Sequence, residues 1–289
     1  MAIIVGAGPS GLATAASLSF HSIPYIILER EDCSASVWKK YSYDRLHLHL
    51  DKQISALPHL QFPDSYPKFV SRKEFISYLD DYFSHFKINP SYRRCVELAE
   101  FDEATEKWIV KARNLDSNQV EEFIERFLIV ATGETCDPYT ADMQGLKSFP
   151  GDVLHSTQYR NGKALETRKL WLSGRIHIVS KEILELGVKL SGYIPVNVAD
   201  WLVGMVSQVL PTISNIRGSE VEFENSETHA FDTIVFCTGF KRSTHLWLKG
   251  DDCLLNEDGI AKQSFPNHWK GEIGCPEEDC LGQTLMRKT

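Results

Sequence analysis

The sequence predicts an α/β protein built on a parallel sheet, and its first thirty residues carry the prediction. Two apolar runs, residues 2–5 and 25–28, are typical of buried parallel strands. Between them, a glycine-rich turn at residues 6–11 leads into a small-residue run, 12–18, that favours a helix. A G-x-G-x-x-G turn between a strand and a helix is typical of a site that binds the pyrophosphate of a dinucleotide.

Each glycine of this turn has its own predicted role. Gly6 permits the tight turn, Gly8 lets the backbone approach the phosphates, and Gly11 lets the helix pack closely on the strand. The N-terminus of the helix adds N–H groups and the positive end of the helix dipole. We therefore predict that the whole turn binds the cofactor: Gly6, Ala7, Gly8, Pro9, Ser10 and Gly11.

The second predicted strand ends in an acidic residue, Glu29. It follows Gly11 by roughly the interval, about 20 residues, at which this fold places an acid that binds a ribose 2′-hydroxyl. The alternative interpretation is a surface glutamate at the end of a strand. Because an acid at this position repels a 2′-phosphate, the first site is predicted to take FAD or NAD rather than NADP.

Length, charge and hydropathy exclude several classes of protein. The 289 residues suffice for one large or two ordinary domains. A net charge of −8 without a long basic run disfavours a nucleic-acid partner. We expect no membrane span, since no apolar run approaches the roughly 18 residues that one needs. We expect no signal peptide either, because no basic segment precedes the first strand.

The seven cysteines form no paired pattern, which suits a reducing compartment, and we expect a cytoplasmic protein. Cys275 and Cys280 have the spacing found in some flavin disulfide reductases. In those enzymes, however, the pair follows the first strand–helix–strand unit, so we predict ordinary thiols here. No metal site is expected, because His47 and His49 have no further ligands in pattern.

Further elements are predicted between residues 34 and 112. A short helical turn is expected at 34–38 and a strand or extended segment at 46–50. Ser71 to Glu74 forms a capping box that should begin a helix. Its apolar face is predicted to consist of Phe75, Ile76, Leu79, Phe83 and Phe86. Residues 95–112 are expected to form a hairpin.

One pattern occurs twice, an apolar strand followed by a small residue, threonine and glycine. Residues 127–130 lead into Ala131-Thr132-Gly133, and residues 233–236 lead into Cys237-Thr238-Gly239. We expect such a turn where the chain leaves a sheet close to a bound dinucleotide, which makes Thr132 and Gly133 candidate cofactor contacts. Amphipathic helices are expected within residues 183–190 and 199–210.

The segment 149–159 fits the pattern F-x-G-x-x-x-H-x-x-x-Y, with Phe149, Gly151, His155 and Tyr159 at its fixed positions. The pattern identifies class B flavin-dependent monooxygenases. More narrowly, several segments resemble the plant YUCCA-type enzymes. The resemblance is continuous from residue 1 to about 160 and covers parts of 175–271, and the segments that carry it are 28–30, 43–53, 130–134, 238–241 and 265–271.

The resemblance implies a reaction. Enzymes of this type bind FAD, reduce it with NADPH, and use O2 to form a C4a-(hydro)peroxyflavin. In the YUCCA branch the substrate is indole-3-pyruvate, and its oxidative decarboxylation gives indole-3-acetic acid in auxin biosynthesis. The flavin supplies the chemistry, and the protein orients and shields it.

The resemblance also implies further cofactor contacts on this chain, at Arg30, Val37, Trp38, Leu48 and Gln53. For Trp38, core packing is an equally good interpretation. For His155 and Tyr159, the implied role is to join two dinucleotide domains rather than to take part in the chemistry.

The chain departs from the family where NADPH should bind. The family places a second G-x-G-x-x-G unit soon after the identifying motif, but residues 161–182 contain none. Arg168, Lys169 and Arg175 can attract a 2′-phosphate, but loose basic residues do not position a nicotinamide. The sequence therefore predicts FAD binding with weak or absent NADPH-driven turnover. The alternative to a working monooxygenase is an FAD-binding remnant.

The predicted architecture is a Rossmann-like FAD-binding domain, a parallel sheet with helices and a β-hairpin insert, plus a reduced second nucleotide-binding domain. We expect the FAD-binding domain over residues 1–160 and the remnant of the NADPH domain over 161–225. A return to the FAD domain with a divergent tail is expected over 226–289.

Overall fold

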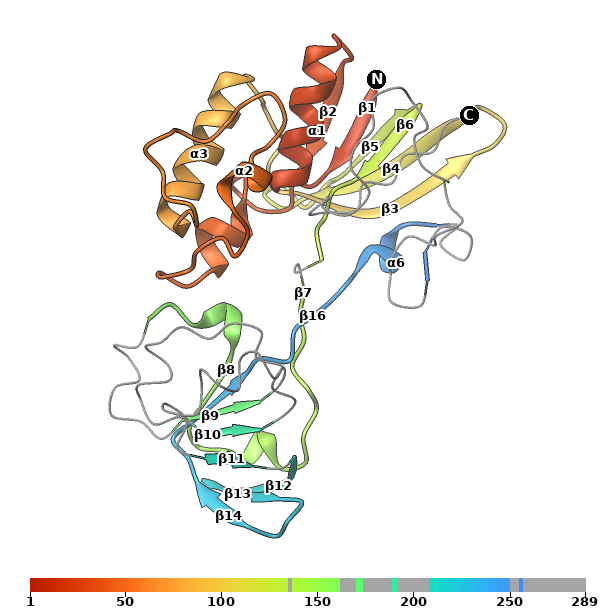
Figure 1. Cartoon of the computed structure of the whole chain (residues 1–289). Helices are drawn as coiled ribbons and strands as arrows, with labels where there is room; N and C mark the ends of the chain where they lie inside the picture. Colours follow the sequence, from red (N-terminus) through yellow and green to blue (C-terminus); the bar gives the residue numbers. More distant parts are fainter. Residues whose placement is uncertain are drawn as a thin grey trace. The chain divides into compact units, whose positions relative to one another are not determined.

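The computed structural model describes residues 1–134, 137–161, 170–173, 189–191, 208–210, 212–249 and 255–256. The chain divides into two compact units, and each is assembled from separate segments (Figure 1). Unit 1 comprises Met1–Lys40, His47–Asp137 and Lys241–Thr289, and unit 2 comprises Tyr41–Leu46 and Pro138–Phe240.

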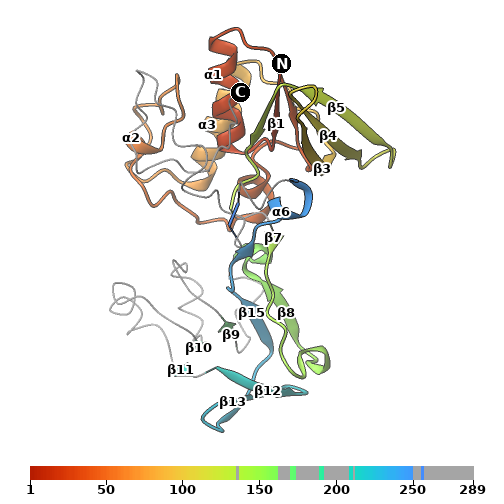
Figure 2. The same ribbon diagram turned by 90° about the vertical axis from the view of Figure 1, so that its right-hand side faces the viewer.

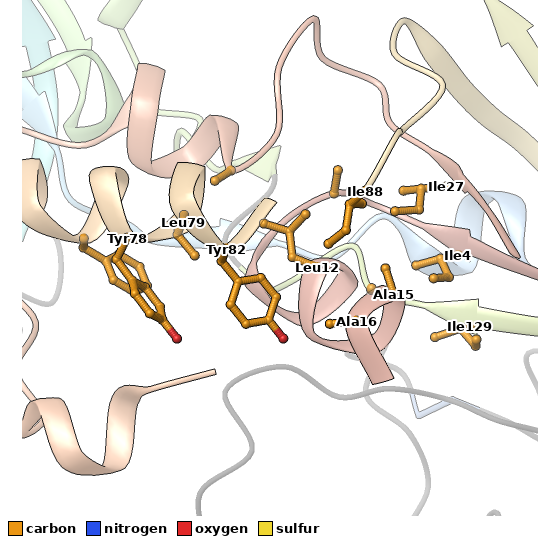
Figure 3. Close-up of a cluster of buried hydrophobic side chains, with 14 of the residues drawn as sticks. Ile4, Leu12, Ala15, Ala16, Ile27, Tyr78, Leu79, Tyr82, Ile88 and Ile129 are labelled. Carbon is orange, nitrogen blue, oxygen red and sulfur yellow. The ribbon is translucent and has the colours of Figure 1, made fainter. Parts of the chain in front are cut away.

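Unit 1 is built on a three-stranded parallel sheet of order β2-β1-β6. Its strands are β1 (Ala2–Val5), β2 (Tyr25–Leu28) and β6 (Phe127–Val130), which confirms all three predicted strands. Helix α1 (Pro9–Phe20) follows β1 directly, as the sequence predicts, and buries its small residues against the sheet (Figure 3).

Helix α3 (Arg72–His85) begins at the predicted capping box, in which the Ser71 N–H donates to Glu74 Oε2 at 2.9 Å. Phe75 and Leu79 are buried as predicted, whereas Ile76, Phe83 and Phe86 are only partly buried. Tyr78 and Tyr82 were not predicted as part of the buried face of α3, but they lie in the same core as the α1 residues (Figure 3). Their hydroxyls donate to the carbonyls of Leu60 and Pro58 at 2.7 and 2.8 Å, which satisfies both buried polar ends.

An antiparallel sheet packs on the other face of the parallel sheet (Figure 2). Strands β3 (Arg94–Asp102) and β4 (Lys107–Asn114) form the predicted hairpin, and β5 (Val120–Glu125) adds a third strand that was not predicted. Because successive side chains of a strand point to opposite faces, Ile4 packs with α1 while Ile3 and Val5 pack with this second core.

The connection from β2 to α3 is mostly irregular. The helical turn expected at 34–38 continues as a π-helix, η1 (Val37–Tyr41). The segment 46–50 was expected to be a strand or an extended segment. It contains no strand and forms an isolated bridge, from His47 to Ser71. A short helix, α2 (Lys52–Ser55), follows.

Unit 2 contains a five-stranded parallel sheet of order β11-β10-β9-β15-β8. Strand β15 (Thr233–Phe236) confirms the prediction for residues 233–236. It lies between β8 (Asp152–His155) and β9 (Leu170–Ser173). On the far side of β9 follow β10 (Lys189–Ser191) and then β11 (Gln208–Leu210), so that β11 and β8 are the edge strands.

Two helix predictions are wrong where the structure describes them. Lys189 and Leu190 belong to β10, and residues 208–210 form β11, so the ends of both expected helices are strands. Short apolar runs cannot be assigned to helix or strand by periodicity alone, and here pairing in the sheet decides. The rest of both expected helices lies outside the described residues.

Smaller elements complete unit 2. Strands β12 (Ile213–Arg217), β13 (Glu220–Phe223) and β14 (Thr228–Ala230) form an antiparallel sheet that was not predicted. Two 3-10 turns flank β8, η2 (Leu146–Ser148) and η3 (Ser156–Gln158). Near the unit boundary, β7 (Asp137–Pro138) pairs with β16 (Phe240–Lys241).

The two units differ from the three ranges expected from the sequence. Residues 138–160 and 226–240 cluster with unit 2, because β8 pairs with β15 across a long stretch of chain. Residues 41–46 also belong to unit 2. Among the described residues, no helix is long and apolar enough to span a membrane.

Candidate dinucleotide-binding site

Three segments of unit 1 meet at the carboxyl edge of the β2-β1-β6 sheet. The glycine turn, residues 6–11, follows β1, Glu29 follows β2, and the turn 131–133 follows β6. Since the strands are parallel, their carboxyl ends share one edge, and this is the edge at which open α/β sheets bind ligands.

Two glycines of the turn are required by packing within the protein. Gly6 has φ +106°, and a Cβ there would lie 2.5 Å from the Ala131 carbonyl oxygen. A Cβ on Gly11 would lie 2.0 Å from the Gly6 carbonyl oxygen. The turn after β1 is therefore folded tightly against both the start of α1 and the turn after β6.

Gly8 differs, because a Cβ built on it meets no heavy atom within 4 Å in the part of the chain that the structure describes. Its backbone is extended and caps helix α1 without any side-chain hydrogen bond, and Pro9 occupies the first turn of the helix. The open face of Gly8 beside a helix N-terminus is a cradle that a side chain would fill, and it fits a diphosphate group.

Glu29 is brought to this turn by β2. Its side chain is buried, with 8% exposure, which excludes the interpretation as a surface glutamate. Oε2 accepts the Ala7 N–H at 2.6 Å, and Oε1 accepts the Glu31 N–H at 2.9 Å. Burial raises the pKa of Glu29, while these two hydrogen bonds favour the charged form and oppose the rise.

The residues after β2 lie at different distances from the core. Arg30 is exposed and pairs with Asp137 at 3.3 Å. Val37 is exposed, whereas the Trp38 ring packs edge-on against Phe75 with 4.5 Å between ring centroids. Trp38 thus makes the core contact that the sequence analysis offered as the alternative.

Leu48 and Gln53 have separate environments. Leu48 is buried in the core beneath α1 and α3, and its N–H donates to the Val70 carbonyl. Gln53 is exposed on α2, and its N–H donates to Asp51 Oδ1 at 2.9 Å. Their contacts with a cofactor therefore stay predictions.

The glycine of the repeated strand–turn pattern has a positive φ in both units. Gly133 has φ +75° and Gly239 has φ +79°, and a Cβ on either would meet no heavy atom within 4 Å. Thr132 and Thr238 are both half-buried. In unit 1 this turn touches the glycine turn through the carbonyl of Ala131.

The identifying motif serves as a structural element within unit 2. Phe149 lies in the hydrophobic core, and a Cβ on Gly151 would lie 2.2 Å from the Asp232 carbonyl oxygen. Tyr159 is buried, with its ring centroid 6.3 Å from that of Tyr43.

His155, also buried, joins the end of β8 to the second small-residue turn. Its Nδ1 accepts the Thr157 N–H at 3.2 Å, so the proton resides on Nε2, which donates to the Gly239 carbonyl at 3.0 Å. Burial lowers the pKa of His155. The contacts described for His155 lie within unit 2, and its role in joining two domains stays a prediction.

Two residues that were not predicted, Ala35 and Arg72, hold the predicted ones in place. The Ala35 N–H donates to the Ala7 carbonyl at 2.9 Å and so ties the segment before Trp38 to the glycine turn. Arg72 donates to the carbonyls of Trp38 and Lys39 at 2.9 and 2.8 Å. The first contact uses only backbone atoms and leaves no signal in a sequence. For the contacts of Arg72, the available signal in the sequence was its position at the start of a capped helix.

Several residues of the sequence analysis lie outside the described residues, namely Cys136, Arg168, Lys169, Arg175, Cys253, Cys275 and Cys280. The described cysteines, Cys33, Cys95 and Cys237, are free thiols.

Comparison with known proteins shows the family to which the chain belongs. Residues 3–174 match the family model of pyridine nucleotide-disulphide oxidoreductases. The chain is 34% identical to the probable indole-3-pyruvate monooxygenase YUCCA10 of Arabidopsis thaliana, over 93% of this chain and 89% of that protein. This chain belongs to the YUCCA family. It is also 30% identical to the A. thaliana indole-3-pyruvate monooxygenase YUCCA6, over 94% of this chain and 83% of that protein.

Solved structures share the fold at lower identity. A flavin-containing monooxygenase from Stenotrophomonas maltophilia superposes with a TM-score of 0.71 at 22% identity, over 90% of this chain and 84% of the other. S-allyl-L-cysteine S-oxygenase from Allium sativum also gives 0.71, at 18% identity, over 89% of this chain and 66% of the other. The YUCCA family consists of flavin-dependent monooxygenases that use FAD and NADPH.

The alignment with YUCCA10 also shows a difference in length. It extends over 341 positions, more than the 289 residues of this chain. The relative therefore contains sequence without a counterpart here. This agrees with the missing second G-x-G-x-x-G between residues 161 and 182.

Proposed function

We propose that this YUCCA-family chain is an FAD-dependent monooxygenase that oxidatively decarboxylates indole-3-pyruvate to indole-3-acetic acid, using O2, in auxin biosynthesis. The observation that carries the flavin site is the open face of Gly8 beside the buried carboxylate of Glu29. The names of the A. thaliana relatives support the substrate. We place the enzyme in the cytoplasm.

The residues of unit 1 bind and orient the cofactor. The N-terminus of α1 would receive the pyrophosphate, and Glu29 would accept a ribose hydroxyl. Val37 and Trp38 would line the flavin side, together with Thr132 and Gly133. When bound, FAD supplies the redox chemistry and the reaction with O2. The protein excludes water from the reacting centre.

The electron donor of the family has no recognisable binding turn in this sequence. NADPH serves the family, but the sequence after β9 begins Gly174-Arg175-Ile176 and lacks a second G-x-G-x-x-G. Without such a turn, the NADPH pyrophosphate has no comparable cradle. This observation favours a second candidate function, an FAD-binding chain whose NADPH-driven turnover is slow or absent.

An anaerobic titration with NADPH separates the two candidates. The FAD-loaded chain is titrated while the visible flavin absorbance is followed, and dithionite serves as the control that the flavin can be reduced. Bleaching by NADPH, followed by formation of indole-3-acetic acid from indole-3-pyruvate in air, supports the monooxygenase. Bleaching by dithionite alone supports the second candidate.

Substitution of Gly8→Val tests the flavin site itself. Since no heavy atom of the described residues lies within 4 Å of a Cβ at this position, the folded chain should accept the side chain, whereas a bound pyrophosphate should collide with it. We expect loss of FAD binding in an equilibrium titration. Thr14→Val, a β-branched side chain six residues further along α1, is the matched control and should bind FAD like the parent. FAD binding by Gly8→Val at the parental affinity would show that the assignment is wrong.

A further inference from the structure

The carboxylate of Glu29 makes two backbone contacts that a ribose-binding role does not require. One oxygen accepts the Ala7 N–H at 2.6 Å and the other accepts the Glu31 N–H at 2.9 Å. Hydrogen bonds from backbone N–H groups to a carboxylate are among the stronger ones in proteins. The acid therefore bridges the turn after β1 and the segment after β2.

These contacts also restrict which N–H groups of the turn can meet a ligand. Glu29 uses the Ala7 N–H, the Gly6 N–H donates to the Leu28 carbonyl, and the Leu12 N–H donates to the Gly8 carbonyl. Pro9 has no N–H. The N–H groups of Gly6 and Ala7 are therefore used within the protein and do not donate to a pyrophosphate.

We propose that Glu29 is a positioning residue that clamps the glycine turn to the end of β2, and that this clamp holds the open face of Gly8 in the orientation that accepts a diphosphate. The clamp is separate from any contact with the ribose. Its effect on cofactor affinity rests on the proposed function, whereas its effect on the chain without cofactor does not.

The chemistry of the clamp predicts which side chains can replace it. A glutamine keeps one oxygen acceptor, but its amide NH2 would face the second backbone N–H, so one of the two hydrogen bonds is lost. An aspartate keeps the charge but is one methylene too short to reach both N–H groups. A change to Glu31→Gln removes a neighbouring negative charge and leaves the clamp intact, because only the backbone of Glu31 takes part.

The test compares the parent with Glu29→Gln, Glu29→Asp and the control Glu31→Gln. Two ligands are used, FAD and the FAD analogue whose adenosine ribose lacks the 2′-hydroxyl. We expect Glu29→Gln to lower the melting temperature of the cofactor-free chain. We also expect it to weaken binding of the analogue by about tenfold to a hundredfold, the effect of one lost charge-assisted hydrogen bond. The control should match the parent in its affinity for both ligands. Since the Glu31 carboxylate pairs with Lys40 at 3.2 Å, any change in its melting temperature measures the loss of that ion pair, against which the effect of Glu29→Gln is compared.

A measurement on the unsubstituted chain covers the case in which a Glu29 variant does not fold. In a pH titration by NMR, the amide protons of Ala7 and Glu31 should shift together with a single apparent pKa, that of Glu29. The charged groups nearest to this carboxylate are Arg30 and Glu31. Glu31→Gln should leave the joint shift of the two amide protons in place, which separates Glu29 from its neighbour.

Two results would overturn the clamp. One is a Glu29→Gln chain with the parental melting temperature that loses affinity for FAD but not for the deoxy analogue, because Glu29 would then act on the ribose alone. The other is a titration in which the two amide protons do not shift together. If even the parent fails to bind FAD, the proposed function is wrong, while the melting temperature and the amide shifts still decide on the clamp.

Discussion

The parallel sheets of units 1 and 2 use the same strand–turn pattern in two different settings. After β6 and after β15 the chain turns through a glycine with positive φ and an open face. In unit 1 that turn contacts the glycine turn and lies at the edge that carries Glu29. In unit 2 it is held by His155 instead. We therefore expect the strand–turn pattern to serve a dinucleotide only where it lies beside a close-approach glycine at a helix N-terminus.

The largest expected effect comes from filling the tightest contact of the unit 1 turn. In Gly11→Ala the new Cβ would lie 2.0 Å from the Gly6 carbonyl oxygen, so α1 must move away from β1. We expect a loss of about 3 kcal/mol or more in the free energy of unfolding, measured by urea denaturation, together with loss of FAD binding.

Gly8→Ala is the matched control for this change, since it makes the same substitution three residues earlier where no heavy atom lies within 4 Å. It should unfold like the parent in the absence of FAD. Equal destabilisation by the two substitutions would contradict the distinction between a packing glycine and a ligand-facing glycine.

A smaller effect is expected from the histidine that holds the turn of unit 2. His155→Gln removes the ring that donates to the Gly239 carbonyl, and we expect a loss of about 1 kcal/mol at pH 7.5 without loss of FAD affinity. Urea denaturation and an FAD titration give the two quantities. A large loss of FAD affinity at unchanged stability would mean that the turn after β15 also serves the FAD site. That result would contradict the distinction between the turns of units 1 and 2.

The same substitution should change the pH dependence of unfolding. Burial lowers the pKa of His155 in the folded chain, so the unfolded chain binds the proton first as the pH falls below the ordinary histidine value, about 6.5. The contribution of His155 to stability is complete above that pH and is lost as the pH falls toward the folded pKa. The parent should therefore lose more stability than His155→Gln between pH 7.5 and 5.5.

The smallest expected effects come from substituting the glycine of each strand–turn pattern, which compares the two turns directly. Gly133→Ala and Gly239→Ala each place a side chain at positive φ, in open space, and each should cost about 1 kcal/mol in stability. Only Gly133→Ala should also weaken FAD binding, because its turn lies at the edge that carries the glycine turn. Equal effects of both substitutions on FAD affinity would contradict this view.

Sequence patterns predicted the elements whose causes are local. The strands β1, β2, β6 and β15 were predicted from their apolar runs, and α3 was predicted from its capping box. The sheet of β12, β13 and β14 was missed because its short strands are interspersed with polar residues.

For the candidate site, the residue types of the glycine turn and of Glu29 were sufficient to predict that they meet. The hydrogen bonds from Ala7 and Glu31 to Glu29 were not predictable, since backbone donors carry no residue-specific signal. The bounds of the two units could not be predicted as continuous ranges of sequence, because the pairing of β8 with β15 joins residues far apart in the chain.

The discontinuity of unit 1 has a consequence for how the chain is made. Its second core, around Ala99 and Trp108, includes Trp247 and Leu248, which α6 (Thr244–Trp247) and the residue after it supply. A ribosome must therefore complete the whole of unit 2 before the last side chains of this core emerge. Until then the face of β3 and β4 that carries Ala99 and Trp108 lacks its cover, and a nascent chain that pauses within unit 2 exposes apolar surface that chaperones recognise.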